Sequence, residues 1–502
     1  MVKKTIYGLL SGIVLTLGAT SCKNHMETPY VEVPERITLA FKLSTVEPTK
    51  ATPLGEAEFT DQKSNSLGSR EKRFSNLYLF FCDENDNYIT GVELKITGAP
   101  VVISDDESTP SSFVVAMAVD EYRRVMGRTC NILTAANLDL SKTGNYDPFT
   151  SVFEATTLSE APLGKAGEFL IPWMSYEEFP VELPRLSDQE MYDLEESGKP
   201  MILNDYRKGG GGDMQATIKL ERGVARLDFK DGSNFRDDKG ERLPHTYSLE
   251  GSDYTLRLTS MVPVNVGTAA YVFKHTSYGT VTDSNFRGID SGLFNKQYPT
   301  TEFPAKWWVD YDADFKDSFI EGKEPGADIF INPISEKDCQ GIVAMNEIDK
   351  ISATAGFGYK PWRYIMENTL PSVASMLPAL TTGLRFEALL CDKTGAAIKP
   401  QYENGSIAPS ITVEWQGDTA DAIYYSGDSI NPEGYYLTYN YFIRSEGESQ
   451  HISSLYPMEF GVVRNNDYCI SIAGFNSLPK EGNVHEANGC FREKSYIIFV
   501  ED

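Results

Sequence analysis

The feature that most constrains the fold is a short stretch near the N-terminus, Arg36 to Ser44, in which apolar and polar residues alternate. Ile37, Leu39, Phe41 and Leu43 occupy every second position. Side chains with a period of two point to one face of an extended strand, whereas a helix would spread them around its axis. The stretch therefore predicts a β-strand that buries four apolar side chains against a core supplied by the rest of the chain.

The rest of the chain favours many short strands over a bundle of helices. Of its 502 residues, 12% are aromatic, and 40 glycines and 26 prolines allow frequent turns. A capping box at Ser187-Asp188-Gln189-Glu190 predicts one short helix, to about Glu196. We expect an all-β fold, mainly antiparallel, with a few short helices and long loops. The main strand-like runs are 76–82, 129–138, 216–229, 460–472 and 495–502.

The first 21 residues are typical of an export signal. Lys3 and Lys4 precede an apolar run that ends at Leu17, and small residues then lead to Cys22. This order resembles a bacterial lipobox, in which the cysteine is acylated, for example with palmitate, and becomes the first residue of a lipoprotein. An ordinary signal peptide followed by an incidental cysteine is the alternative. No later stretch reaches the roughly 20 apolar residues that a spanning helix needs, so acyl chains would hold the protein at a membrane.

The segment 45–73 is polar, lacks periodicity and contains Pro and Gly, which indicates an exposed loop. Exposed loops are preferred protease sites. An anchored strand, a loop that can be cut and a large β-rich body together suggest that the first strand, 36–44, is removable. The basic residues available for cutting are Lys50, Lys63, Arg70, Lys72 and Arg73.

The glycine-rich segment 208–213 is interpreted as a loop beside a domain boundary. No Gly-Lys-Ser/Thr follows, so it does not match a phosphate-binding loop. We expect an N-terminal domain from 22 to 214 and a C-terminal domain, with long loop insertions, from 215 to 502.

Several classes of function are disfavoured. The net charge of −26 argues against nucleic acid, because phosphate binding needs a basic surface. The five histidines show no catalytic or metal-binding spacing, and no nucleophile or dinucleotide motif is present, so no enzyme and no cofactor are predicted. The acidic turn after Cys82 fails the calcium-loop pattern, because Tyr88 and Leu94 occupy its glycine and glutamate positions. We therefore predict no metal site.

The six cysteines after Cys22 form no CxxC motif. Cys82, Cys391 and Cys469 lie in apolar runs, which favours buried free thiols. An exported protein can also form disulfides, and Cys469 with Cys490 is the first pair to test.

Taken together, these segments resemble the fimbrillin family, the type V pilins of Bacteroidales. The resemblance extends over most of the mature chain. It rests on the lipobox at Cys22, the strand before Thr49-Lys50-Ala51, and the segments 77–81, 132–137, 171–174, 221–226, 367–369, 381–383 and 458–468.

The resemblance implies two tandem transthyretin-like β-sandwiches and export to the surface of the outer membrane. It also implies that a trypsin-like protease removes the first strand and that a strand of another fimbrial subunit then fills the vacated groove, as in donor-strand exchange. Lys50-Ala51 occupies the position of the family's cut. Because Lys50 is not arginine, an arginine-specific protease would need Arg70 or Arg73 instead.

The resemblance leaves the position in a fimbria open. If the run 496–500 closes its own sheet, the subunit accepts a strand without donating one, which suits a tip that adheres to a receptor on a host or bacterial surface. The alternative is an uncleaved outer-membrane lipoprotein that acts as a pilus anchor or binds carbohydrate. For the latter, Trp307, Trp308 and Trp415 could stack on sugars.

Overall fold

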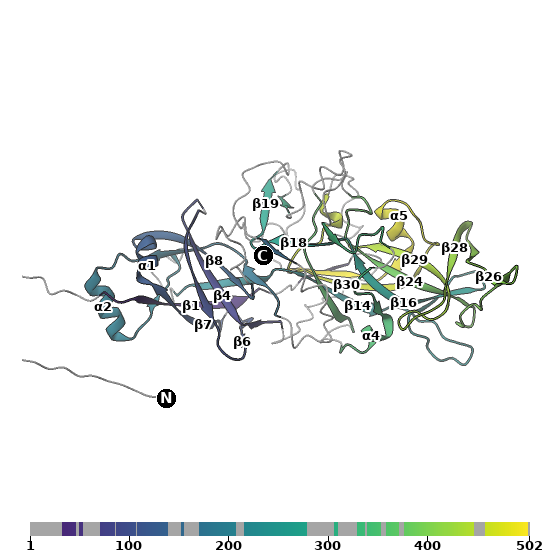
Figure 1. Cartoon of the computed structure of the whole chain (residues 1–502), viewed down its shortest axis with the longest axis horizontal. Helices are drawn as coiled ribbons and strands as arrows, with labels where there is room; N and C mark the ends of the chain where they lie inside the picture. The colour runs from purple at the N-terminus through teal and green to yellow at the C-terminus, as the bar shows by residue number, and fades with distance from the viewer. Residues whose placement is uncertain are drawn as a thin grey trace, which may run out of the picture.

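The computed structural model describes residues 33–46, 50–53, 71–85, 87–106, 108–138, 152–154, 170–206, 215–278, 306–309, 329–336, 339–352, 358–370, 376–445 and 457–499. The predictions on the export signal, Cys22, Lys63, Arg70 and the glycine-rich segment lie outside these residues. The chain forms two β-rich bodies that lie end to end along the long axis of the molecule (Figure 1).

The first body is built on one nine-stranded sheet. Its main order is β12-β1-β13-β10-β8-β4-β5, with β7 paired to β1 and β11 paired to β8. The edge strand β5 also contacts β7, so the sheet curves around a single core. Its strands are β1 (Arg36–Thr45), β4 (Asn76–Cys82), β5 (Tyr88–Lys95), β7 (Ser111–Ala118), β8 (Arg128–Ala136), β10 (Trp173–Ser175), β11 (Phe179–Leu183), β12 (Met201–Ile202) and β13 (Thr217–Arg222).

The second body packs two sheets face to face. Leu227 and Ile470 from one sheet share a core with Leu258, Phe386 and Tyr439 from the other. One sheet contains β2 (Lys50–Pro53), β14 (Ala225–Asp231), β23 (Lys360–Ile365), β30 (Asp467–Phe475), β31 (Phe491–Glu493) and β32 (Tyr496–Phe499). The other contains β15 (Thr246–Ser248), β16 (Tyr254–Val264), β22 (Val343–Ala344), β24 (Gly383–Asp392), β27 (Ser410–Trp415), β28 (Asp418–Tyr425) and β29 (Gly434–Phe442).

Short helices and two-stranded ladders fill the connections. The helices are α1 (Val119–Val125), α2 (Asp188–Ser197), α4 (Met345–Asp349), α5 (Val484–Gly489) and the 3-10 turn η7 (Pro457–Phe460). The ladders pair β3 (Arg73–Phe74) with β6 (Val101–Val102), β9 (Val152–Glu154) with β18 (Ala269–Tyr271), β17 (Val266–Gly267) with β21 (Phe330–Ile331), β19 (His275–Tyr278) with β20 (Lys306–Val309), and β25 (Tyr402–Glu403) with β26 (Ser406–Ile407). No described helix is long and apolar enough to cross a membrane.

The predicted all-β fold is confirmed, and so is the predicted helix. Most strand pairs are antiparallel, and the parallel exceptions join β1 to β12 and β13, and β14 to β30. At the start of α2 the Ser187 hydroxyl accepts a hydrogen bond from the Glu190 amide, at 3.3 Å. The Glu190 carboxylate accepts one from the Ser187 amide, at 2.7 Å.

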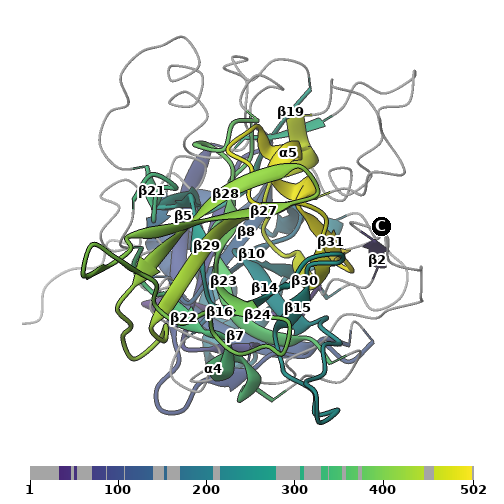
Figure 2. The same ribbon diagram turned by 90° about the vertical axis from the view of Figure 1, so that its right-hand side faces the viewer.

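Part of the segment expected to be an exposed loop is built into the fold. Lys50–Pro53 form β2, an edge strand paired with β32 in the second body (Figure 2). Further on, Glu71 and Lys72 are buried. The prediction of a continuous loop over 45–73 is therefore wrong at both of these places, because tertiary pairing orders a segment that has no periodicity of its own.

Two other expectations are corrected. Cys469 and Cys490 are free thiols, so the disulfide proposed between them is absent. Trp415 is buried and donates its indole N–H to the Glu250 carbonyl at 2.9 Å, which leaves no ring face open to a sugar. The side chains of Trp307 and Trp308 lie outside the described part of the chain.

Between β13 and β14 the chain passes from the first body to the second at a tight point. The run 216–229 forms two strands, of which β13 belongs to the first body and β14 to the second. Gly223 lies between them, where an added Cβ would clash with the Met174 side chain. Although residue 214 was expected to end the first domain, β13 still contributes to the first sheet.

Candidate functional site: the groove that holds the first strand

The first strand, β1, lies inside the nine-stranded sheet and not at its edge. One of its sides pairs antiparallel with β7, from Arg36 opposite Ala118 to Leu43 opposite Ser111. The other side pairs in parallel, first with β12 and then with β13. We call the space between β7 on one side and β12 and β13 on the other the β1 groove.

Backbone hydrogen bonds hold β1 on its β12–β13 side and at both ends. The Lys42 amide donates to the Ala216 carbonyl at 2.8 Å, and the Leu203 amide donates to the Ala40 carbonyl at 2.9 Å. At its start, the Glu35 carbonyl accepts from the Val119 amide at 3.0 Å. At its end, the Val46 amide donates to the Leu220 carbonyl at 2.7 Å. The β1 groove therefore pairs with a strand in antiparallel fashion along β7 and in parallel fashion along β12 and β13.

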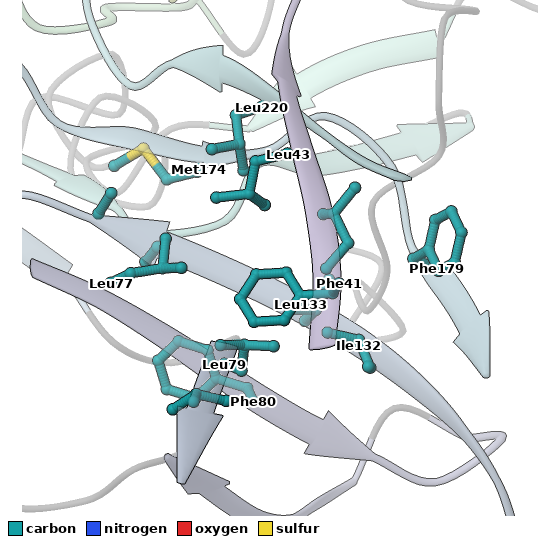
Figure 3. Packing of buried hydrophobic residues seen from close by; sticks show 14 of the residues in the cluster. Phe41, Leu43, Leu77, Leu79, Phe80, Ile132, Leu133, Met174, Phe179 and Leu220 are labelled. Atoms are coloured by element: carbon teal, nitrogen blue, oxygen red, sulfur yellow. The ribbon is translucent and has the colours of Figure 1, made fainter. Parts of the chain in front are cut away.

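The four alternating apolar side chains of β1 all enter the core. Ile37, Leu39, Phe41 and Leu43 are each no more than 1% exposed. The Phe41 ring stacks on the ring of Phe113, directly opposite on β7, with 6.0 Å between centroids. Figure 3 shows Phe41 and Leu43 among apolar side chains from β4, β8, β10, β11 and β13.

Strand β7 joins the sheet through β1 alone among the described strand pairs. Its own alternation buries Phe113, Val115 and Met117 and exposes the residues between them. If β1 left, β7 would lose its ladder and both walls of the β1 groove would present unpaired amides and carbonyls. Unpaired edges of this kind bind another strand readily.

The burial at stake is large. At about 2 kcal/mol for each fully buried apolar side chain, the four residues of β1 contribute roughly 8 kcal/mol before ordering costs. An empty β1 groove would expose its apolar side chains to water, and this exposure favours the binding of another strand.

The residues predicted for proteolytic processing have different environments. The backbone of Lys50 and Ala51 is paired with Phe499 and Ile498 in β2 and β32. Arg73 lies in β3 and is only half-buried. The Lys72 ammonium is buried and lies 2.5 Å from the Asp105 carboxylate. These four positions are therefore held in ladders or ion pairs.

Glu71 anchors the chain at the junction of the two bodies. Its buried carboxylate lies 3.3 Å from the Arg222 guanidinium and 3.4 Å from that of Arg226, and it accepts a hydrogen bond from the Tyr364 hydroxyl. Burial acts to raise the pKa of Glu71, but the two guanidiniums outweigh it and lower that pKa. The Glu71 carbonyl also accepts from the Trp173 indole at 2.9 Å. Chain beyond residue 70 is thus fixed independently of β1.

Two further acids complete this junction cluster, which comprises Glu71, Arg222, Arg226, Asp228 and Asp467. Asp228 pairs with Arg226 at 2.8 Å, and Asp467 contacts both arginines. Burial, reinforced by the Asp467 charge and only partly opposed by Arg226, raises the pKa of Asp228 to about 6. Three carboxylates therefore share two guanidiniums in a buried site.

A second buried network joins residues from the segments 221–226, 367–369 and 458–468. Arg464 pairs with Glu367, both fully buried, and donates to the Val272 carbonyl at 3.0 Å. The nearby Glu221 pairs with Lys274 at 3.2 Å. These residues join elements of both bodies, so they are structural.

The described residues contain no group of three potential ligands placed to hold a metal ion. In the acidic turn before β5, one Asp83 oxygen already accepts from the amides of Asn85 and Asn87, both at 2.9 Å. These contacts form a turn rather than an ion cage.

The sequence predicts β1 and, within the run 216–229, β13, but not the other two walls of the groove, β7 and β12. Residues 112–125 form β7 followed by α1. The signal was present, because Phe113, Val115 and Met117 recur at a period of two, while Val119, Tyr122 and Val125 recur every third residue. No pattern in Met201–Ile202 identifies β12.

No protein-family model and no curated protein matches the chain. Three solved structures illustrate what it is similar to. A proposed cell adhesion protein of Parabacteroides distasonis is 14% identical, with a TM-score of 0.41 over 93% of this chain and 97% of that one. The fimbrilin FimA of Porphyromonas gingivalis is 13% identical, with a TM-score of 0.37 over 94% and 99%.

The tip fimbrial protein Mfa3 of Porphyromonas gingivalis, solved with a C-terminal truncation, is 10% identical, with a TM-score of 0.35 over 92% and 99% of the two chains. Such distant likenesses leave function to be inferred from the geometry of β1. All three structures are of fimbrial or proposed cell adhesion proteins.

Proposed function

We propose that the protein is a structural subunit of a cell-surface fimbria, in which β1 is a temporary occupant of its groove. After export, β1 is cut away and a strand from a homologous subunit replaces it. The physical event is β-augmentation, in which main-chain hydrogen bonds give affinity and alternate side chains fill pockets.

The observation that carries this proposal is the position of β1. A strand at the N-terminal end of a domain can leave without threading the chain through the fold. β1 nevertheless occupies the inside of a sheet, with β7 attached through it alone among the described pairs. Its removal would therefore create a slot with two hydrogen-bonding walls and an apolar floor, which fits one incoming strand.

The structure also supports a stable body after the cut. Glu71 is held by the junction cluster, and the Arg73 carbonyl accepts from the Asn137 side chain at 2.8 Å. Segments before and after residue 70 are thus anchored by separate interactions. In this proposal Cys22 carries the lipid that holds the precursor in the outer membrane, and cleavage releases the subunit for assembly.

Strand β32 is already paired on both sides, with β30 and β2. A strand held on both edges is poorly suited to donation. This supports a subunit that receives a strand, as at a fimbrial tip, where the exposed surface would adhere to a receptor.

One observation favours the second candidate, an uncleaved lipoprotein that anchors a pilus. The predicted cut between Lys50 and Ala51 lies within the β2–β32 ladder, and proteases need an extended, unpaired substrate. If no cut occurs, β1 stays in place and the lipid on Cys22 persists.

The N-terminus of surface material discriminates between the two candidates. Assembly with cleavage predicts a free Ala51, Glu71 or Phe74, whereas an anchor predicts a blocked, acylated Cys22. A triple variant with Lys50→Ala, Arg70→Ala and Arg73→Ala should accumulate as folded, lipid-bound monomer. Lys95→Ala, at an exposed lysine on β5, is the matched control. Unimpaired assembly of the triple variant would refute processing at these sites.

A further inference from the structure

The last two residues of β1 carry polar groups that the fold does not satisfy. Ser44 is fully buried and Thr45 is 2% exposed, yet neither hydroxyl has a hydrogen-bond partner among the described residues. Their backbones are paired, since Ser44 lies opposite Lys219 and Thr45 opposite Leu220 on β13. The defect is therefore confined to the two side chains.

A buried hydroxyl without a partner weakens the strand that carries it. The hydroxyl gives up its hydrogen bonds to water when β1 docks and gains nothing in return. Alanine at position 44 and valine at position 45 would keep nearly the same shape without that loss. The other end and middle of β1 show no such defect, because Ile37, Leu39 and Phe41 are well-packed apolar residues.

We propose that β1 binds its groove less tightly than a partner strand does. The β1 groove prefers a partner strand with small apolar side chains at the two positions filled by Ser44 and Thr45. This inference rests on the proposed exchange function and adds the chemistry of the partner. The incoming strand keeps the alternating large apolar residues at the positions of Ile37, Leu39, Phe41 and Leu43. The free energy of exchange is then favourable because of the two positions that pair with β13, those of Ser44 and Thr45.

Peptide competition tests the preference. The folded, full-length chain is incubated with two distinguishably labelled peptides, one with the sequence of Arg36–Thr45 and one with Ser44→Ala and Thr45→Val. The tethered β1 competes equally with both, so their uptake ratio reports groove preference alone. We expect the substituted peptide to be taken up about tenfold more for each hydroxyl removed, or about a hundredfold in total.

The reciprocal experiment uses the chain itself. Ser44→Ala with Thr45→Val in the full-length protein should lower uptake of the unsubstituted peptide by a similar factor, because β1 is held more tightly. The matched control is Thr134→Val on β8, which also removes a buried hydroxyl that has no partner among the described residues. Thr134 lies outside the groove strands, so this control should leave peptide uptake unchanged.

The outcomes separate the inference from the function on which it rests. Equal uptake of both peptides, or better uptake of the unsubstituted one, would overturn the inference and leave strand exchange intact. An equal effect of Thr134→Val would also overturn it, because the gain would then be general stabilisation. If neither peptide enters even at high excess once β1 has been cut from the chain, strand exchange itself fails, and the inference fails with it.

Discussion

Replacing Phe41 by alanine should weaken β1 far more than it weakens the rest of the first body. Phe41 is fully buried, and its ring stacks on Phe113 with 6.0 Å between centroids. Large-to-small changes at such positions cost about 3–5 kcal/mol, of which the ring pair accounts for roughly 0.5–1.5 kcal/mol. Because these contacts all lie between β1 and its groove, the loss should appear as a loosened strand.

Two assays separate the loss of stability of the whole first body from the loosening of β1 alone. Urea unfolding, followed by fluorescence of the buried Trp173, gives the free energy of unfolding of the first body. Uptake of labelled Arg36–Thr45 peptide by the folded chain reports how often the groove is open. Phe41→Ala should raise uptake at least about a hundredfold, since 3 kcal/mol corresponds to roughly two decades in an equilibrium constant.

The control is Phe74→Ala. Phe74 is equally buried in the same body, but its ring packs on Trp173, with 6.1 Å between centroids. This variant should lose a similar free energy of unfolding with little change in peptide uptake. If Phe41→Ala and Phe74→Ala raise uptake equally, β1 opens only when the whole body unfolds, and the reasoning is refuted.

Two further predictions concern the buried charges. Because burial raises the pKa of Asp228 from 3.8 to about 6, its contribution to stability is full below pH 4 and falls as the pH rises through 6, by up to about 3 kcal/mol. The unfolding free energy of wild type minus that of Asp228→Asn should therefore fall from pH 4 to pH 7, because asparagine mimics the neutral acid and does not titrate; a pH-independent difference would contradict this assignment. Glu367→Gln should destabilise the second body by about 3–5 kcal/mol, because it leaves the Arg464 charge buried without its partner. Chemical denaturation at pH 7 measures this loss, and a cost below 1 kcal/mol would show that Arg464 is satisfied by the backbone carbonyls it also contacts.

The sequence predicts elements whose stability is local or strictly periodic. β1 follows from alternation at a period of two, and α2 follows from a capping box that satisfies its own first amides. Both patterns act within a few residues, so neither depends on knowing the rest of the fold.

Elements that form only by pairing with distant parts of the chain cannot be predicted from local sequence patterns. Lys50–Pro53 contains one apolar side chain besides proline, yet it forms β2 because β32 offers an unpaired edge. Glu71 lies in a polar segment that suggests exposure, yet arginines from both bodies bury it. Such residues are placed by partners distant in sequence, and alternation or propensity carries no information about those partners.

The central claim, that another subunit's strand replaces β1, is tested most directly at Phe113. This residue faces Phe41 across the groove, so a photo-crosslinking amino acid at position 113 reacts with whatever strand lies there. In surface fimbriae, mass spectrometry of the crosslinked product should identify a strand from a second polypeptide, with residues 36–45 of the same chain absent. Crosslinks that join position 113 only to the chain's own β1 would contradict strand replacement.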